Sequence, residues 1–218
     1  MLDLAKPYIS HDGKKNSYPM AFAPTFHRYR LDEPQRIKKP QNIFVCSMAD
    51  LFGDWIPDEW IQQVFEACEK APWNRYLFLT KNPDRYGKLL RTNKLQKNKN
   101  FWYGITVTSG DDAFIRCSTL NFKDGFNWFL SYEPMLDGLN NVHFPRNIKW
   151  VIVGAETGNR KGKVIPKREW IENIANECRK QNVPVFLKNN LAEVWGKSLI
   201  QEFPWGENNK EGINGQHT

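Results

Sequence analysis

The chain repeats one pattern six times: a short apolar run, rich in β-branched and aromatic residues, that ends abruptly in small or polar side chains. Residues 150–158 show it clearly, because Trp-Val-Ile-Val is followed by Gly-Ala and then by Glu156. Continuous apolar runs of this length are typical of parallel strands buried on both faces. Each run therefore predicts a buried strand that delivers polar groups at its carboxyl end. The six runs are residues 43–50, 76–82, 102–108, 126–133, 150–158 and 185–190.

Amphipathic helical patterns lie between most of these runs, and alternation of strands with helices predicts a parallel sheet with right-handed crossovers. Either an open doubly wound sheet or a barrel would satisfy this alternation. No Gly-x-Gly-x-x-Gly follows the first run and no P-loop motif occurs, which argues against the usual nucleotide-binding sheets. Polar residues at every strand end suit a barrel, whose site is assembled from those ends. We predict an α/β fold, namely a partial TIM-like (βα) barrel of about six parallel strands.

The length of 218 residues suits one domain with a sizeable core. Residues 1–40 are polar and proline-containing, and predict an irregular N-terminal arm. Residues 41–205 are expected to form the partial barrel, and residues 206–218 a flexible tail. No apolar run approaches the roughly 20 residues that cross a bilayer, so no membrane partner is expected. No signal-peptide pattern is evident at the start, and the expected location is the cytoplasm.

The formal net charge of +7 and the pI of about 9.2 permit attraction to phosphate groups. Within the arm, a basic run could contact nucleic acid or could simply be solvated surface, and the sequence leaves both open. The run consists of Arg28, Arg30, Arg36, Lys38 and Lys39.

Four widely spaced cysteines contain no Cys-x-x-Cys pair, so we expect reduced and mostly buried thiols and predict no metal ligands. They are Cys46, Cys68, Cys117 and Cys178.

Two carboxylates and one amine follow predicted strands and could carry out acid/base chemistry: Glu133, Glu156 and Lys188. If the carboxylates converge, mutual repulsion and partial burial would raise the pKa of one of them, while the nearby lysine would lower it again. The alternative interpretation is a structural ion pair at the mouth of the barrel. Both interpretations remain open at this point.

Four ordered segments, residues 43–52, 78–83, 130–136 and 151–158, resemble a family of phage-associated and bacterial proteins of unknown function, similar to radical S-adenosylmethionine enzymes. The resemblance covers residues 22–188. It implies a radical-SAM-like partial barrel that holds a [4Fe-4S] cluster on three N-terminal cysteines and binds S-adenosylmethionine across its strand ends. Carried over by position, Glu133 and Glu156 would face this cofactor. The expected cofactor-binding residues are Ser47, Asp50, Thr80, Lys81, Thr106 and Thr108.

The sequence departs from the family pattern in one respect that affects mechanism. No cysteine precedes Cys46, so the three-cysteine motif is missing, and cluster chemistry needs thiolates close together. The chain could be N-terminally shortened, it could have lost the cluster and kept the barrel as a binding module, or a second protein could supply the ligands. Shortening is the favoured interpretation.

Two functions follow from these observations. The first is a radical-SAM-like barrel protein of unknown substrate that lacks its own iron-sulfur ligands, is inactive as given, and acts on nucleic acid. The second is a cluster-free, phage-associated module that binds nucleic acid through the basic arm and through tryptophans near a groove. Most of these tryptophans are also expected to belong to the core. They are Trp73, Trp102, Trp128 and Trp150.

Overall fold

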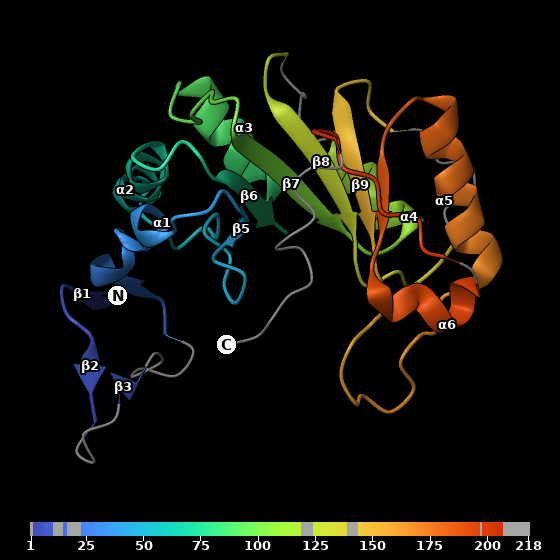
Figure 1. Cartoon of the computed structure of the whole chain (residues 1–218), viewed down its shortest axis with the longest axis horizontal. Coiled ribbons are helices and arrows are strands. Elements are labelled where there is room, and N and C mark those ends of the chain that lie inside the picture. The colour runs from blue at the N-terminus through green and yellow to red at the C-terminus, as the bar shows by residue number, and fades with distance from the viewer. Residues whose placement is uncertain are drawn as a thin grey trace.

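The computed structural model describes residues 2–10, 15–16, 23–118, 124–138, 144–196 and 198–206. Six strands form one parallel sheet that curls into a half-barrel (Figure 1). Strands that are consecutive along the chain lie side by side, in the order β10-β9-β8-β7-β6-β5. The prediction of an α/β partial barrel with six parallel strands is confirmed. The strands are β5 (Asn42–Val45), β6 (Arg75–Thr80), β7 (Phe101–Val107), β8 (Asn127–Tyr132), β9 (Ile148–Val153) and β10 (Val185–Leu187).

Helices follow four of the strands and pack against the convex face of the sheet. The first of them starts after Pro57 with Asp58 and Glu59 in its first turn, where negative charge favours a helix start. The described residues of the β8–β9 connection, 133–138 and 144–147, contain no helix. No helix in the described ranges is long and apolar enough to span a bilayer. The helices are α2 (Asp58–Glu69) after β5, α3 (Pro83–Arg91) after β6, α4 (Gly110–Ser118) after β7 and α5 (Arg168–Lys180) after β9.

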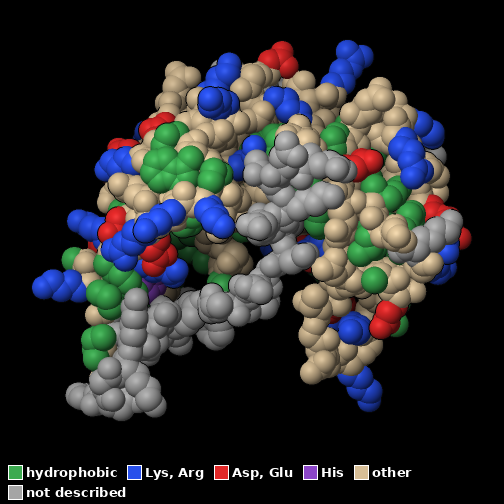
Figure 2. Space-filling model, viewed as in Figure 1, with side chains coloured by type: hydrophobic (Ala, Val, Ile, Leu, Met, Phe, Trp, Pro, Cys, Tyr) green, Lys and Arg blue, Asp and Glu red, His purple; other side chains and the backbone are tan. Residues whose placement is uncertain are grey.

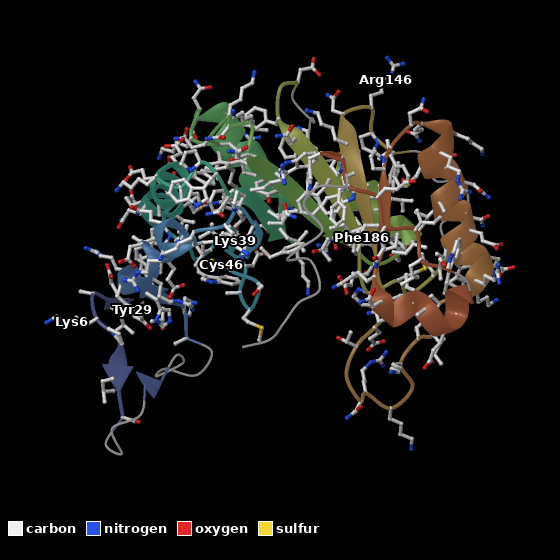
Figure 3. All side chains as sticks on the ribbon, in the orientation of Figure 1. Lys6, Tyr29, Lys39, Cys46, Arg146 and Phe186 are labelled. Carbon is white, nitrogen blue, oxygen red and sulfur yellow. The ribbon has the colours of Figure 1, made fainter. Side chains whose placement is uncertain are left out.

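Alternating side chains divide the strands between two cores, because successive residues of a strand point to opposite faces. The convex-face cluster joins strand residues such as Tyr103 and Trp128 to helix residues such as Phe65. The concave-face cluster is smaller and strongly aromatic, and it includes Phe186, which Figure 3 labels on β10. Its buried members are Leu77, Trp102, Phe129, Trp150, Ile152 and Phe186.

The concave face is covered by residues 198–206, which we call the C-terminal strap. The helix before it, α6 (Ala192–Trp195), ends at Gly196, which has a φ of 63°. The strap then runs antiparallel to β10, with Leu187 N donating to the Ile200 carbonyl at 2.8 Å. Its aromatic residues Phe203 and Trp205 pack on Trp150, at ring-centroid distances of 5.9 and 5.1 Å. The strap therefore closes the open side of the aromatic cluster.

Three of the four tryptophans considered for nucleic-acid stacking are core residues. The relative exposures of Trp102, Trp128 and Trp150 are 6%, 0% and 0%, whereas Trp73 is 43% exposed. Their burial confirms the interpretation as core, and it removes these three rings from any surface that could stack on bases.

The N-terminal arm contains short elements within its described residues. Its last strand brings Phe26 onto Trp60 of α2, with ring centroids 4.8 Å apart, and Trp73 Nε1 donates to the Ile37 carbonyl at 2.8 Å. These contacts attach the arm to the barrel. Residues 207–218, most of the expected flexible tail, lie outside the described residues. The elements of the arm are β1 (Leu2–Leu4), β2 (Tyr8–Ile9), β3 (Lys15–Asn16), β4 (Thr25–His27), η1 (Arg28–Arg30) and α1 (Glu33–Arg36).

A glycine in the middle of β7 allows the concave-face cluster to pack. A Cβ atom added to Gly104 would lie only 2.2 to 2.5 Å from ring atoms of Phe129 on the neighbouring strand. The Phe129 ring is fully buried and has little room to move. Close contact between this ring and the β7 backbone is therefore possible only without a side chain at position 104.

We expect Gly104→Ala to lower the free energy of unfolding by about 1–3 kcal/mol, because an overpacked core must shift side chains or backbone. Urea denaturation followed by circular dichroism measures this change. Gly87→Ala in α3 is the matched control: its Cβ meets only the tip of the Arg91 side chain at 3.4 Å. The control should be neutral or should stabilise by up to about 1 kcal/mol, because alanine favours helix. Equal effects of the two substitutions would contradict the packing argument.

Candidate functional site at the carboxyl edge of the sheet

The carboxyl ends of all six strands lie along one edge of the sheet because every pairing is parallel. This edge is at the lower side of the half-barrel in Figure 1, and the lower side of the molecule is hollowed in the space-filling view (Figure 2). Polar side chains that follow the strands therefore share one region, as the sequence predicts.

The principal feature of this edge is an ion pair between Glu133, which follows β8, and Lys188, which follows β10. Lys188 Nζ lies 2.7 Å from Glu133 Oε1 and 2.9 Å from Oε2. The lysine side chain is 33% exposed and the glutamate side chain 24% exposed, so a ligand in the solvent can reach both. Of the three predicted catalytic residues, these two are brought together.

A glycine at the end of β9 makes this pair possible, since β9 lies between β8 and β10. A Cβ atom on Gly154 would lie 2.7 Å from Glu133 Oε1, so the carboxylate passes over this glycine to reach the lysine. Backbone hydrogen bonds extend the ladders one residue past the strands and hold the three residues level. Glu133 N donates to Val107 O at 3.2 Å, Gly154 N to Tyr132 O at 3.0 Å, and Lys188 N to Val153 O at 2.9 Å.

Two hydroxyl groups come next along the concave face. Thr106 of β7 and Ser131 of β8 are register partners, and alternation from Trp102 and Phe129 assigns both side chains to the concave face. They are 5% and 2% exposed. Among the described residues neither hydroxyl has a hydrogen-bond partner, so both could bind a ligand or water.

Asp50, the Thr80 hydroxyl and the backbone N–H of Lys81 hold two loops together. Asp50 Oδ2 accepts hydrogen bonds from Thr80 Oγ1 at 2.9 Å and from Lys81 N at 3.0 Å, while Oδ1 accepts one from Phe52 N at 2.9 Å. Because both carboxylate oxygens are engaged, Asp50 fixes the loop after β5 against the end of β6. Ser47 is exposed in that same loop.

Thr108 is part of the start of α4. Its N and Oγ1 lie 2.9 and 3.2 Å from Asp112 Oδ2, and Asp112 also pairs with Arg116. This arrangement stabilises the first turn of the helix. Of the six expected cofactor-binding residues, Thr106 is therefore the one that strand register and alternation place on the same face as the Glu133–Lys188 pair.

Glu156 has a different cationic partner from Glu133. Its carboxylate accepts hydrogen bonds from Arg160 Nε at 2.5 Å and Nη2 at 2.8 Å, and from Val164 N at 3.2 Å. The Arg160 guanidinium, followed by the Val164 amide, lowers the pKa of Glu156 to about 2. A carboxylate so strongly held as an anion is a poor proton carrier near neutral pH.

The cysteines do not fit a [4Fe-4S] cluster. Cys68 and Cys178 are buried in α2 and α5, Cys117 is half-buried in α4, and Cys46 is exposed directly after β5 (Figure 3). Burial raises the pKa of Cys178 to about 12 and that of Cys117 to about 11. The described ranges contain no group of three or more His, Cys, Asp or Glu side chains that could hold a metal ion.

Comparison with protein families matches residues 5–211 to a family described as "Protein of unknown function (DUF5131)". The chain belongs to the DUF5131 family. Comparisons with curated proteins and with solved structures gave no match. Membership agrees with the resemblance to a family of unknown function, and the DUF5131 description names neither a reaction nor a ligand.

Several residues that build this edge of the DUF5131 chain are absent from the sequence predictions. Gly154 and Arg160 were not singled out, nor was Asn190, whose side-chain amide contacts Ala155 N at 3.1 Å and Ala155 O at 2.9 Å. A signal for Arg160 was available, because it follows Glu156 by four residues. The contacts of Gly154 and Asn190 depend on strand register, which the local sequence does not reveal.

We expect Glu156 to remain ionised down to about pH 2. Its lowered pKa means that its contribution to stability is fully present above the unfolded-state pKa, roughly 4.3, and is lost as the pH falls through the folded value. A 13C NMR titration of the side-chain carboxyl measures this directly. Arg160→Met should move the midpoint back up towards the ordinary value, and a wild-type midpoint near that value would contradict the assignment.

Proposed function

We propose that the carboxyl edge of the half-barrel binds a small molecule that carries an α-amino-acid group, with S-adenosylmethionine as the first candidate. The observation that carries the proposal is the Glu133–Lys188 pair, which offers a carboxylate and an ammonium group side by side. A ligand ammonium would pair with Glu133 and a ligand carboxylate with Lys188.

The energetics of the pair favour exchange with such a ligand. An ion pair that is partly open to solvent contributes only about 0–1 kcal/mol, so a zwitterionic ligand can replace it with two new charge-assisted bonds at little cost. The hydroxyls of Thr106 and Ser131 lie next along the same face and could bind further polar atoms of the ligand.

The ligand would lie over the edge of the sheet and not deep inside the half-barrel. The strap fills the concave face further from the edge, where Trp205 packs against Trp102 at a centroid distance of 5.1 Å and Arg75 stacks on Trp205 at 3.9 Å. On the described part of the concave face, space for a ligand is therefore confined to the strand ends and the loops that follow them.

The proposal is limited to binding, because the described cysteines do not fit an iron-sulfur cluster. That the protein acts on nucleic acid stays a prediction, and the described contacts of the basic run do not support it. Three cations of the basic run already have acidic partners, and these pairs are Arg28 with Asp3, Arg30 with Glu33 and Arg36 with Asp32.

Isothermal titration calorimetry with S-adenosylmethionine tests the proposal. Glu133→Gln and Lys188→Met should each weaken binding about tenfold or more, since hydrogen bonds to charged groups contribute about 1.5–3 kcal/mol. Glu172→Gln is the matched control, because it removes a 2.9 Å ion pair with Arg168 on α5. The control should bind like the wild type.

Competition separates recognition of the amino-acid group from recognition of the nucleoside. Free methionine should displace S-adenosylmethionine, whereas 5′-methylthioadenosine, which lacks the amino-acid group, should not. Absence of binding to the wild type, or unchanged affinity in both edge variants, would overturn the proposal.

A further inference from the structure

We propose that Glu156 is a positioning residue that fixes residues 157–164 as one wall of the ligand site. The inference rests on the proposed function for its ligand, but the geometry of the loop stands independently. It replaces the acid/base role that the sequence suggested for Glu156 by a structural role toward the same site.

One carboxylate closes this loop across its base. Glu156 Oε1 and Oε2 bind the Arg160 guanidinium, and Oε2 also accepts the backbone N–H of Val164, eight residues further along the chain. The Glu156 side chain is only 15% exposed, whereas that of Arg160 is 58% exposed. The loop therefore folds around a largely covered carboxylate, and the Arg160 side chain lies between that carboxylate and the solvent.

The rest of the loop has few other attachments. Every residue from 157 to 163 is exposed, and the remaining described contacts within the loop are a 3.3 Å hydrogen bond from Lys163 N to the Arg160 carbonyl and a 3.5 Å approach of Lys163 Nζ to the Gly158 carbonyl. Gly158 and Gly162 have φ values of 84° and 74°, so they allow the sharp turns that return the chain to Val164. The loop depends chiefly on Glu156 for its conformation.

The base of the loop is shared with the proposed ligand site. Gly154, over which the Glu133 carboxylate passes, is two residues before Glu156. Ala155 is held on both its N–H and its carbonyl by Asn190, which is two residues after Lys188. From this base the loop projects below the carboxyl edge, between β9 and α5 (Figure 1). A ligand held by Glu133 and Lys188 would lie beside it.

Limited trypsin digestion of the full chain tests the positioning role without any ligand. Arg160, Lys161 and Lys163 provide cleavage sites inside the loop, and mass spectrometry reports the rate at each. Glu156→Gln should raise these rates about tenfold, because loss of a charged hydrogen bond increases local opening. Glu156→Asp should give an intermediate rate, and Glu172→Gln, which breaks the Arg168 pair on α5, should leave the loop rates unchanged. The melting temperature of each variant verifies that the chain is folded.

Stopped-flow measurement of S-adenosylmethionine dissociation tests whether residues 157–164 form a wall of the ligand site. Glu156→Gln should raise the dissociation rate constant several-fold with little change in the association rate constant, a split that general destabilisation would not produce. Wild-type cleavage rates in Glu156→Gln would overturn the positioning role. Faster cleavage of Glu156→Gln with an unchanged rate of ligand dissociation would contradict the assignment of this loop as a wall of the ligand site. Absence of S-adenosylmethionine binding to the wild type would contradict both the proposed function and the assignment of the loop as a wall of the ligand site. The digestion result would still decide whether Glu156 fixes the conformation of the loop.

Discussion

A parallel sheet buries both of its faces, and this requirement governs the whole molecule. The convex face is covered by four helices that follow β5, β6, β7 and β9. The concave face of a half-barrel has no opposite wall, so another part of the chain must cover it. Here the C-terminal strap meets that requirement with Phe203 and Trp205, which complete a cluster of aromatic rings around Trp150.

The same alternation separates apolar from polar positions on the concave face. Trp102 and Phe129 lie where the strap covers the sheet, and nearer the carboxyl edge Thr106 follows Trp102 by four residues on β7 while Ser131 follows Phe129 by two on β8. The concave-face side chains therefore become more polar towards the carboxyl edge, along strands that continue without interruption. A site at that edge is open to solvent, while the part of the sheet that carries it is held rigidly by buried rings.

The fold could be predicted from the sequence because its signal is local. Each strand is an uninterrupted apolar run, and all six such runs became adjacent strands in chain order. The site was predicted only in part. Glu133 and Lys188 were recognised as strand-end residues, but their contact depends on Gly154, and register across three strands determines that contact. The partner of Glu156 lies four residues away and was accessible to local reasoning, whereas the clamp of Asn190 on Ala155 was not.

The strap also makes the two edges of the sheet unlike each other. At β10 the backbone groups of Leu187 and Val185 are bonded to Ile200 and Glu202, so that edge is already occupied by the chain itself. At the opposite edge, β5 pairs with β6 alone within the described part of the sheet. Growth of this half-barrel by a further strand is thus possible in one direction only, and a strand that extends the curve towards a closed barrel must pair with Asn42–Val45.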